Sequence, residues 1–425
     1  MAQRVIPSGD LVRPAGMRDG VVRSAVDVRG LWAELRRTVE GEVRFDDGSR
    51  ALYAHDASNY RQVPLGVVLP RSKDDAVAAI AACRAFGAPI VSRAGGTGLC
   101  GQTTNTAVVL DWSKYMNRIV ELDPERRLAR VLPGVICDDV VHAAAPHGLT
   151  YGPQPATHTH CCFGGMLANN SCGMYAQMAG KAVDNTEEMD VALYDGTRMT
   201  VGWISDEQLR VGAVGSGRAA GIYAALRSLR ERYGELIRER YPRVPRRVSG
   251  YNLDSLLPDE KGRINLARAL VGSEGTCVTM LEMTVRLIPS PPERALVVLG
   301  YPDVYRAADH IMEVLEAAPL ALEGIDARLY EHVRKKHDPK AKFLGLLPPG
   351  FGWLIAEVGG DTEAEALERA EALRARVEAL GDPPAVKIVT DPGERKHLLS
   401  VREAGLGATA FVPGEPDTWE GWEDS

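Results

Sequence analysis

The feature that most restricts the fold is a glycine-rich loop that lies directly between two expected strands. Residues 92–102 read SRAGGTGLCGQ, and the GTGLCG within them fits the dinucleotide-binding pattern G-x-G-x-x-G. A Rossmann turn of that kind must lead straight into a helix. Residues 102–113 instead read QTTNTAVVLDWS, which favours a loop followed by a strand. A Walker phosphate loop is excluded as well, because no Gly-Lys-Ser/Thr follows.

Two interpretations of this glycine loop remain. Successive backbone N–H groups in such a loop can form a nest that binds an anion without a helix. The alternative is a plain glycine-rich turn without a ligand.

Composition sets the broad class of the protein. The 425 residues carry a formal charge of −7, and 45% of them are hydrophobic, which predicts a globular protein of two or three domains. That charge gives no overall attraction to nucleic acid, and no run approaches the ~20 apolar residues of a membrane span. Seven cysteines without a C-x-x-C pair favour a reducing cytoplasm, and argue against a disulfide framework or a self-contained iron–sulfur site.

Periodicity and turn signals predict the elements before residue 290. We expect helices at 28–41, 73–87, 137–148 and 219–239, a buried strand at 88–93, a strand at 107–111, hairpins at 118–132 and 187–202, and a strand, a loop and a strand over 268–289. Residues 151–173, YGPQPATHTHCCFGGMLANNSCG, are too polar and glycine-rich for a core element, and so long a loop is typically functional. The basic run at 238–247 is expected to be a solvated loop.

The sequence changes character after PSPPER at residues 289–294, where we place a domain boundary. Beyond it we expect strands at 295–301, 320–325, 351–359 and 385–390, with helices at 304–318 and 362–380. That β-α-β-β-α-β order is typical of a ferredoxin-like domain. The expected division is therefore a leader over 1–61, a first domain over 62–290 and a second over 291–425.

Three loops in order resemble those of the vanillyl-alcohol oxidase superfamily, which has a p-cresol methylhydroxylase-type FAD domain. They read APIVSRAGGTGLCGQ, GPQPATHTHCCFGGMLANNSCG and GSEGTCVTMLE. The stretches YAHDASNYRQVPLGVVLPRS, VSGYNLDSLL and PLALEGIDARL resemble the branch that holds D-lactate dehydrogenases, glycolate oxidase flavin subunits and D-2-hydroxyglutarate dehydrogenases. This resemblance covers roughly residues 40–425.

The resemblance implies an α+β fold: a two-subdomain FAD-binding domain of the p-cresol methylhydroxylase type, followed by an incomplete ferredoxin-like substrate cap. It implies FAD bound non-covalently, with the pyrophosphate on residues 93–101. The implied cofactor-binding residues are Arg93, Ala94, Gly95, Gly96, Thr97, Gly98, Leu99, Gly101, Gln102, Pro153, Thr157, Cys162, Gly164, Gly165, Asn169, Ser171, Glu274, Gly275 and Thr276. Four positions depart from the family pattern: Gln154, Cys162, Phe163 and Val278.

The implied reaction is oxidation of a D-2-hydroxy acid (D-lactate, D-2-hydroxyglutarate or glycolate) to the 2-oxo acid, with hydride transfer to the flavin. Electrons would pass to a quinone, a cytochrome or an iron–sulfur protein rather than to NAD. Such a protein would be cytoplasmic, or peripheral to the membrane through its redox partner. Arg402 is the candidate clamp for the substrate carboxylate, and the alternative is a surface Arg–Glu pair at a helix end.

The catalytic base is expected to be missing, because the family's late His-rich stretch, G-H-x-G-D-G-N-x-H, does not occur before Ser425. We therefore expect no metal site in this chain, and iron–sulfur clusters or a divalent metal only in a missing C-terminal part. The isolated chain should bind FAD weakly and turn over poorly. A soft-metal site or a covalent flavin link at His158–Cys162 is a lesser alternative to a loop over the flavin edge.

Two other functions stay open. One is a flavin oxidase of a sugar or an alcohol. The other, of a different class, is a non-catalytic FAD-binding subunit or an inactive fragment.

Overall fold

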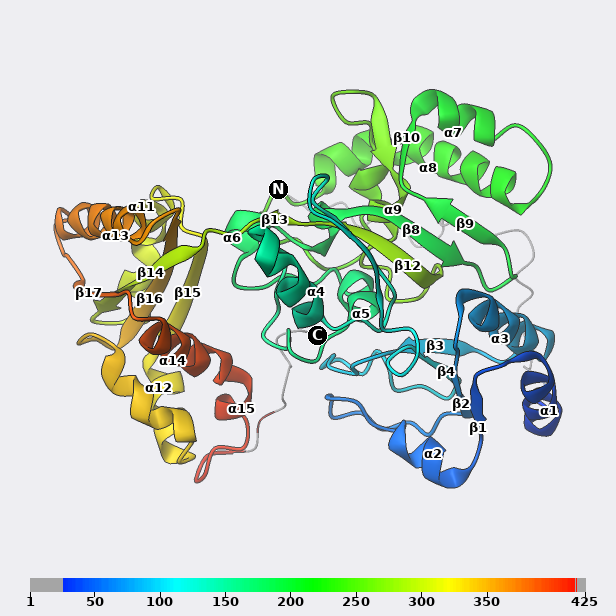
Figure 1. Cartoon of the computed structure of the whole chain (residues 1–425), viewed down its shortest axis with the longest axis horizontal. Helices are drawn as coiled ribbons and strands as arrows, with labels where there is room; N and C mark the ends of the chain where they lie inside the picture. Colours follow the sequence, from blue (N-terminus) through cyan, green and yellow to red (C-terminus); the bar gives the residue numbers. More distant parts are fainter. Residues whose placement is uncertain (1–25, 417, 419–425) are drawn as a thin grey trace, which may run out of the picture.

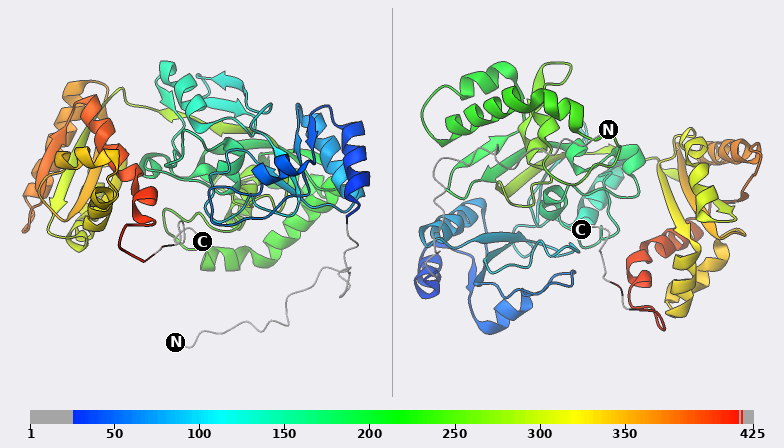
Figure 2. Two further views of the ribbon diagram at one scale, coloured as in Figure 1. Left: turned by 90° about the horizontal axis from the view of Figure 1, so that it is seen from below. Right: turned by 180° about the vertical axis from the view of Figure 1, so that it is seen from behind.

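The computed structural model describes residues 26–416 and 418. The chain forms a large lobe up to residue 290 and a smaller lobe from Glu293 onward, and the views agree that the two lie side by side (Figures 1 and 2). We call the smaller lobe the cap. Their hydrophobic cores share no residue, because the large-lobe core ends at Leu287 and the cap cores begin at Ala295. The fold is α+β.

The first sheet of the large lobe has the order β1-β2-β4-β3, with β1 antiparallel and the others parallel. Strands β2 and β4 are buried along their whole length, as apolar parallel strands usually are. The strands are β1 (Glu42–Arg44), β2 (Gly66–Leu69), β3 (Ile90–Arg93) and β4 (Val108–Asp111), and the nearby helices are α1 (Val28–Thr38), α2 (Asp47–Leu52) and α3 (Lys73–Ala85). Residues 28–44, expected in the leader, thus belong to this layer.

The glycine loop connects β3 directly to its parallel neighbour β4, and no helix lies between them. The prediction of strand, glycine loop and strand is therefore confirmed, and the Rossmann alternative is excluded. Strand β3 is only half-buried at each position, so the expectation of a buried strand was wrong.

The second sheet is antiparallel, with the order β5-β6-β12-β8-β9, and its buried residues join the same core as those of the first sheet. Its strands are β5 (Ile119–Asp123), β6 (Leu128–Val131), β8 (Thr186–Ala192), β9 (Arg198–Val201) and β12 (Thr279–Arg286). Around it are the pairs β7 (Leu149–Thr150) with β13 (Ile288–Pro289) and β10 (Trp203–Ser205) with β11 (Arg263–Asn265), and the helices α4 (Cys137–Ala144), α5 (Phe163–Ala168), α6 (Ala176–Ala179), α7 (Asp206–Gly212), α8 (Arg218–Arg240) and α9 (Leu266–Leu270).

Two expectations for this region were wrong. The first strand expected within 268–289 is instead the helix α9, which begins where the Asn265 side chain accepts from the Arg268 N–H; its Leu, Ala and Arg residues are good helix formers. The loop at 151–173 was expected to lack core elements, yet it contains α5, with Phe163, Met166 and Leu167 buried.

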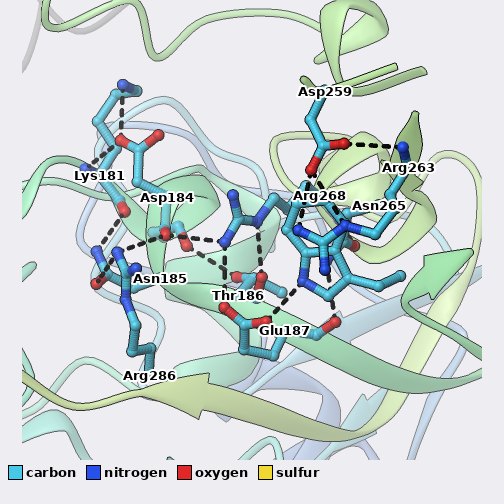
Figure 3. A network of polar contacts seen from close by, with 12 residues as sticks. Lys181, Asp184, Asn185, Thr186, Glu187, Asp259, Arg263, Asn265, Arg268 and Arg286 are labelled. Carbon is cyan, nitrogen blue, oxygen red and sulfur yellow. Dashed lines mark hydrogen bonds and ion pairs between the residues drawn. The ribbon is translucent and has the colours of Figure 1, made fainter. Parts of the chain in front are cut away.

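A polar network attaches α9 and β12 to the start of β8 (Figure 3). The Arg268 guanidinium donates to the carbonyl of Thr186 at 2.9 Å and pairs with Glu187 at 3.1 Å, while Arg286 donates to the carbonyl of Asp184 at 3.1 Å. The fully buried Asn185 donates to the carbonyl of Ala179 at 2.7 Å. Burial lowers the pKa of Arg268. These residues hold the scaffold together behind the loops described below.

The cap is an antiparallel sheet with the order β15-β16-β14-β17, built from β14 (Glu293–Tyr301), β15 (Ala321–Asp326), β16 (Gly352–Gly360) and β17 (Ala385–Val389). One face packs on α10 (Val304–Asp309), α11 (Ile311–Leu315) and α13 (Glu363–Glu378), and the other on α12 (Ala327–Lys335), α14 (Pro392–Glu403) and α15 (Gly405–Thr409). The ferredoxin-like prediction is confirmed. The single helix expected at 304–318 is two helices that meet at His310. No described helix is long and apolar enough to span a bilayer.

Candidate active site

A cleft of about 1290 Å³ lies between the large lobe and the cap. The large-lobe wall is formed by residues within the segments 97–102, 154–158, 169–175, 246–250 and 272–274. The cap wall is formed by Val304 and by residues within 323–329 and 399–409. The structure therefore brings the three sequence loops to one place, opposite helix α14.

The glycine loop presents backbone N–H groups to this cleft. Thr97, Gly98 and Leu99 line the cleft, and their N–H groups donate to no residue that the structure describes. Gly96 and Gly101 adopt φ of +62° and +77°, a conformation that glycine adopts without steric cost. Successive unused N–H groups at such a turn provide an anion nest.

Gly95 serves a different purpose, which is close approach to the second loop. A Cβ atom on Gly95 would lie 2.4 Å from the carbonyl oxygen of His160. Any larger residue would push the two loops apart.

The second and third loops are hydrogen-bonded to each other beneath the cleft. The N–H of Gly272 donates to the carbonyl of Leu167 at 2.9 Å, and the N–H of Glu274 donates to the carbonyl of Ala168 at 3.1 Å. The side chain of Gln102 from the glycine loop donates to Glu274 at 3.5 Å. The three loops thus form one connected rim.

The predicted site residues fall into two groups. Those that line the cleft are Thr97, Gly98, Leu99, Gln102, Thr157, Asn169, Ser171, Glu274 and Arg402. Those outside its lining are Arg93, Ala94, Gly95, Gly96, Gly101, Pro153, Cys162, Gly164, Gly165, Gly275 and Thr276.

Two residues of the second group have contacts or burial within the large lobe. The Arg93 guanidinium donates to the carbonyl of Tyr53 at 3.3 Å and lies over the Tyr53 ring at 5.3 Å. Cys162 is only 5% exposed, and burial raises the pKa of its thiol to about 12.

Arg402, on α14, faces the cleft from the cap. Its Nε donates to Glu323 Oε2 on β15 at 2.5 Å, while its Nη groups donate to no described residue. The Arg402 side chain is 37% exposed and that of Glu323 is 10% exposed. The buried carboxylate therefore orients the guanidinium and leaves its Nη groups available to an anion.

Sequence reasoning missed a fourth segment of the large-lobe wall. Arg246, Val248, Ser249 and Gly250 line the cleft, although the run that contains Arg246 was expected to be a solvated loop. Its guanidinium contacts the Cys172 sulfur at 2.9 Å. No periodicity indicates this placement, because it depends on how the chain returns after α8.

The His158–Cys162 segment does not form a metal cluster. His158 Nδ1 lies 2.6 Å from Asp138, and His160 Nδ1 lies 2.6 Å from the Thr159 hydroxyl. Among the described residues, no group of three or more His, Cys, Asp and Glu side chains could hold a metal ion.

Comparison with known proteins identifies the family. Residues 64–202 match the model of the FAD binding domain, and residues 290–425 match that of the C-terminal domain of FAD linked oxidases. Among solved structures, an alkyldihydroxyacetonephosphate synthase superposes with a TM-score of 0.60 at 14% identity, over 87% of this chain and 63% of that one. That likeness shows the shared fold.

Three curated relatives lie in one branch of the family. D-2-hydroxyglutarate dehydrogenase of Pseudomonas putida is 30% identical over 88% of this chain and 38% of its own length. The glycolate oxidase subunit GlcD of Bacillus subtilis is 28% identical over 88% of this chain and 68% of its own. D-lactate dehydrogenase of Archaeoglobus fulgidus is 26% identical over 68% of this chain and 52% of its own.

The chain spans little more than a third of the D-2-hydroxyglutarate dehydrogenase of Pseudomonas putida. The match to the FAD binding domain nevertheless spans the first two of the three loops at the cleft. The chain therefore belongs to the FAD-linked oxidase family, in the branch of the D-2-hydroxyglutarate, glycolate and D-lactate dehydrogenases.

Proposed function

We propose that this chain binds FAD non-covalently in the cleft and oxidises a D-2-hydroxy acid to the 2-oxo acid. The observation that carries the proposal is the anion nest of Thr97–Leu99 facing a cleft whose opposite wall presents Arg402. One wall suits a pyrophosphate and the other a substrate carboxylate.

The residues present fit FAD. The cleft, at about 1290 Å³, exceeds the roughly 300–1,000 Å³ of ordinary ligand pockets, so a large cofactor and a small acid fit together. The side chains of Asn169 and Ser171 line it and make no hydrogen bond to a described residue, which leaves their amide and hydroxyl groups for the cofactor. When bound, FAD supplies the two-electron acceptor that no side chain can provide.

Arg402 would bind the substrate carboxylate. Its planar guanidinium can accommodate a carboxylate through two parallel N–H bonds, and Glu323 already fixes its Nε. A carboxylate held there is oriented before the C2–H bond reacts, and orientation of this kind lowers the barrier.

The electrons would then pass to an acceptor other than NAD, such as a quinone, a cytochrome or an iron–sulfur protein. The glycine loop supports this choice, because it lacks the crossover helix of an NAD-binding Rossmann turn.

A cytoplasmic location is consistent with the free, buried thiols of Cys137 and Cys161.

The test is anaerobic reduction of the flavin-loaded chain. D-lactate, D-2-hydroxyglutarate and glycolate are mixed with it separately, and bleaching of the flavin absorbance is followed. We expect slow bleaching by at least one acid, in line with the prediction that the isolated chain turns over poorly, and none by the L-enantiomers of the chiral acids. Flavin that binds but is bleached by no 2-hydroxy acid would favour a non-catalytic FAD-binding subunit. If air is admitted after bleaching, rapid return of the flavin absorbance would favour a flavin oxidase.

A further inference from the structure

A buried polar cluster lies where the chain crosses from the large lobe to the cap. At the start of β14, Arg294 Nη1 donates both to the hydroxyl of Tyr175 and to Glu357 Oε2, each at 2.8 Å. Its Nη2 donates to the Ser290 hydroxyl at 2.8 Å. Tyr175 precedes α6 and lines the large-lobe wall of the cleft, whereas Glu357 lies on β16 of the cap. One guanidinium therefore joins the large lobe, the connecting segment and the cap.

Burial makes these contacts matter more than those of an exposed ion pair. The side chains of Arg294 and Glu357 are 16% and 3% exposed, and a carboxylate so far from water depends on its partners. Arg294 Cζ also lies over the Tyr175 ring, 5.2 Å from its centroid. Burial and the nearby Glu357 raise the pKa of the Tyr175 hydroxyl, which therefore stays protonated at neutral pH.

The same buried carboxylate faces the helix that carries Arg402. Arg395 of α14 has its Nη1 4.0 Å from Glu357 Oε1, and its buried Nε donates to no described residue. Arg395 precedes Arg402 by about two turns on the same face of α14. Glu357 therefore links the cluster at the lobe junction to the helix of the candidate clamp.

The clamp and the cluster also share one face of the cap sheet. Glu323 lies two residues from Ala321, the register partner of Glu357, so both carboxylates project from the same side. Helix α14 thus faces the sheet through two Arg–Glu pairs. The Arg402 pair opens to the cleft, and the Arg395 pair continues to the large lobe.

We propose that Tyr175 is a positioning residue for Arg402: through Arg294 and Glu357 it fixes the orientation of α14 relative to the large-lobe wall. The kinetic consequence of this inference rests on the proposed function. An acid that binds to a cap already held at one orientation loses less freedom than one that must order the cap as it binds. Loss of the Tyr175 hydroxyl should therefore weaken binding of the acid and leave FAD in place.

The first variant is Tyr175→Phe, which removes the hydroxyl and keeps the ring, with Tyr305→Phe as its matched control. Tyr305, on α10 of the cap, is 78% exposed and lies outside the cleft lining. We expect Tyr175→Phe to raise the acid concentration that gives half-maximal flavin reduction by roughly three- to tenfold, the range of one lost hydrogen bond. The limiting rate and FAD affinity should stay within about twofold, as expected for lost binding of the acid alone. Tyr305→Phe should match the wild type.

A double variant separates positioning of Arg402 from a general structural role. If Tyr175 acts through Arg402, adding Tyr175→Phe to Arg402→Gln should raise the half-saturating acid concentration no further. Equal rises in the wild-type and Arg402→Gln backgrounds would overturn the inference, because independent effects add.

Hydrogen exchange tests the same inference without any substrate. In the full chain loaded with FAD, the backbone amides of residues 392–409 should exchange faster in Tyr175→Phe than in the wild type and in Tyr305→Phe. Unchanged exchange would overturn the positioning role. A wild-type chain that no 2-hydroxy acid reduces would overturn the proposed function alone, and the exchange result would then decide this inference by itself.

Discussion

The two walls of the cleft differ in which atoms they present. The large-lobe wall consists of loops that are hydrogen-bonded to each other. It offers the N–H groups of residues 97–99 and mostly uncharged side chains such as Asn169, with Arg246 and Glu274 as charged exceptions. The cap wall offers charged side chains from a helix and a strand, above all Arg402 and Glu323. Backbone groups bind a constant part of a cofactor, whereas side chains are free to change with the substrate.

Arg402 should have the largest effect on the cap side. Arg402→Gln is expected to remove about 2–3 kcal/mol of transition-state binding, roughly 30- to 150-fold in kcat/KM, because it removes charge-assisted bonds to the carboxylate. Steady-state kinetics measures the loss, and flavin fluorescence should show unchanged FAD affinity. Arg374→Gln on α13, a half-buried arginine of the same lobe that does not line the cleft, is the control. Equal losses of kcat/KM and of FAD affinity would contradict the division in which the large-lobe wall binds FAD and the cap wall binds the substrate.

On the large-lobe side, a substitution at Gly95 should lower FAD affinity. Gly95→Ala places a Cβ 2.4 Å from a backbone carbonyl, so the loop must move. We expect FAD affinity to fall by about tenfold or more, and stability by about 1–3 kcal/mol. Flavin titration and urea unfolding measure these two effects.

Gly221→Ala is the matched control for that substitution. A Cβ at Gly221 meets nothing within 4 Å inside helix α8. That change should raise stability by about 0.5–1 kcal/mol and leave flavin binding unchanged. Normal flavin binding by Gly95→Ala would contradict a role for the spacing between the first two loops.

A substitution of Glu323 should affect the kinetics less than the substitution of Arg402. Glu323→Gln keeps the shape of the side chain but weakens its hold on the Arg402 Nε. We expect KM for the acid to rise by roughly fivefold, about 1 kcal/mol, with kcat less changed. A fall in KM would show that Glu323 competes with the substrate for Arg402 instead of orienting it.

The smallest expected effect lies far from both walls, at Glu42 on β1. Hydrogen bonds from Lys114 and Tyr115 and the nearby Arg44 lower the pKa of its carboxyl to about 2. Because the folded pKa lies below the unfolded value of about 4.3, the stabilisation is present at neutral pH and is lost as the pH falls from about 4 towards 2. Solvent screening limits it to less than about 1 kcal/mol.

Urea unfolding of Glu42→Gln and wild type at pH 6 and pH 3 checks this. The two curves should differ at pH 6 and approach each other at pH 3. A constant difference would contradict the lowered pKa.

The sequence predicts well what depends on local patterns. The glycine loop followed by AVVLD required a strand, and the structure has β4 there. The order of strands and helices predicted for the cap was sufficient to predict its sheet, because each strand and helix there has its own apolar pattern. The strand predicted from residue 268 was wrong, because a short apolar run fits a helix or a strand, and the Asn265 cap begins the helix α9 there.

What the sequence could not supply are contacts between distant segments. Asp138 and His158 are twenty residues apart, and only the crossing of α4 with the following loop brings them together. Glu323 and Arg402 meet because β15 and α14 face the same layer of the cap. Arg246 reaches the cleft only after the long helix α8 has returned the chain. Such contacts follow from packing, which no local pattern encodes.

The described chain passes between the lobes once, at residues 290–293, and the hydrophobic cores of the two lobes share no residue. Each lobe can therefore unfold as a cooperative unit of its own, and a substitution within the cap core should lower the melting temperature of the cap alone. A solved structure at 14% identity shares this fold over 87% of the chain.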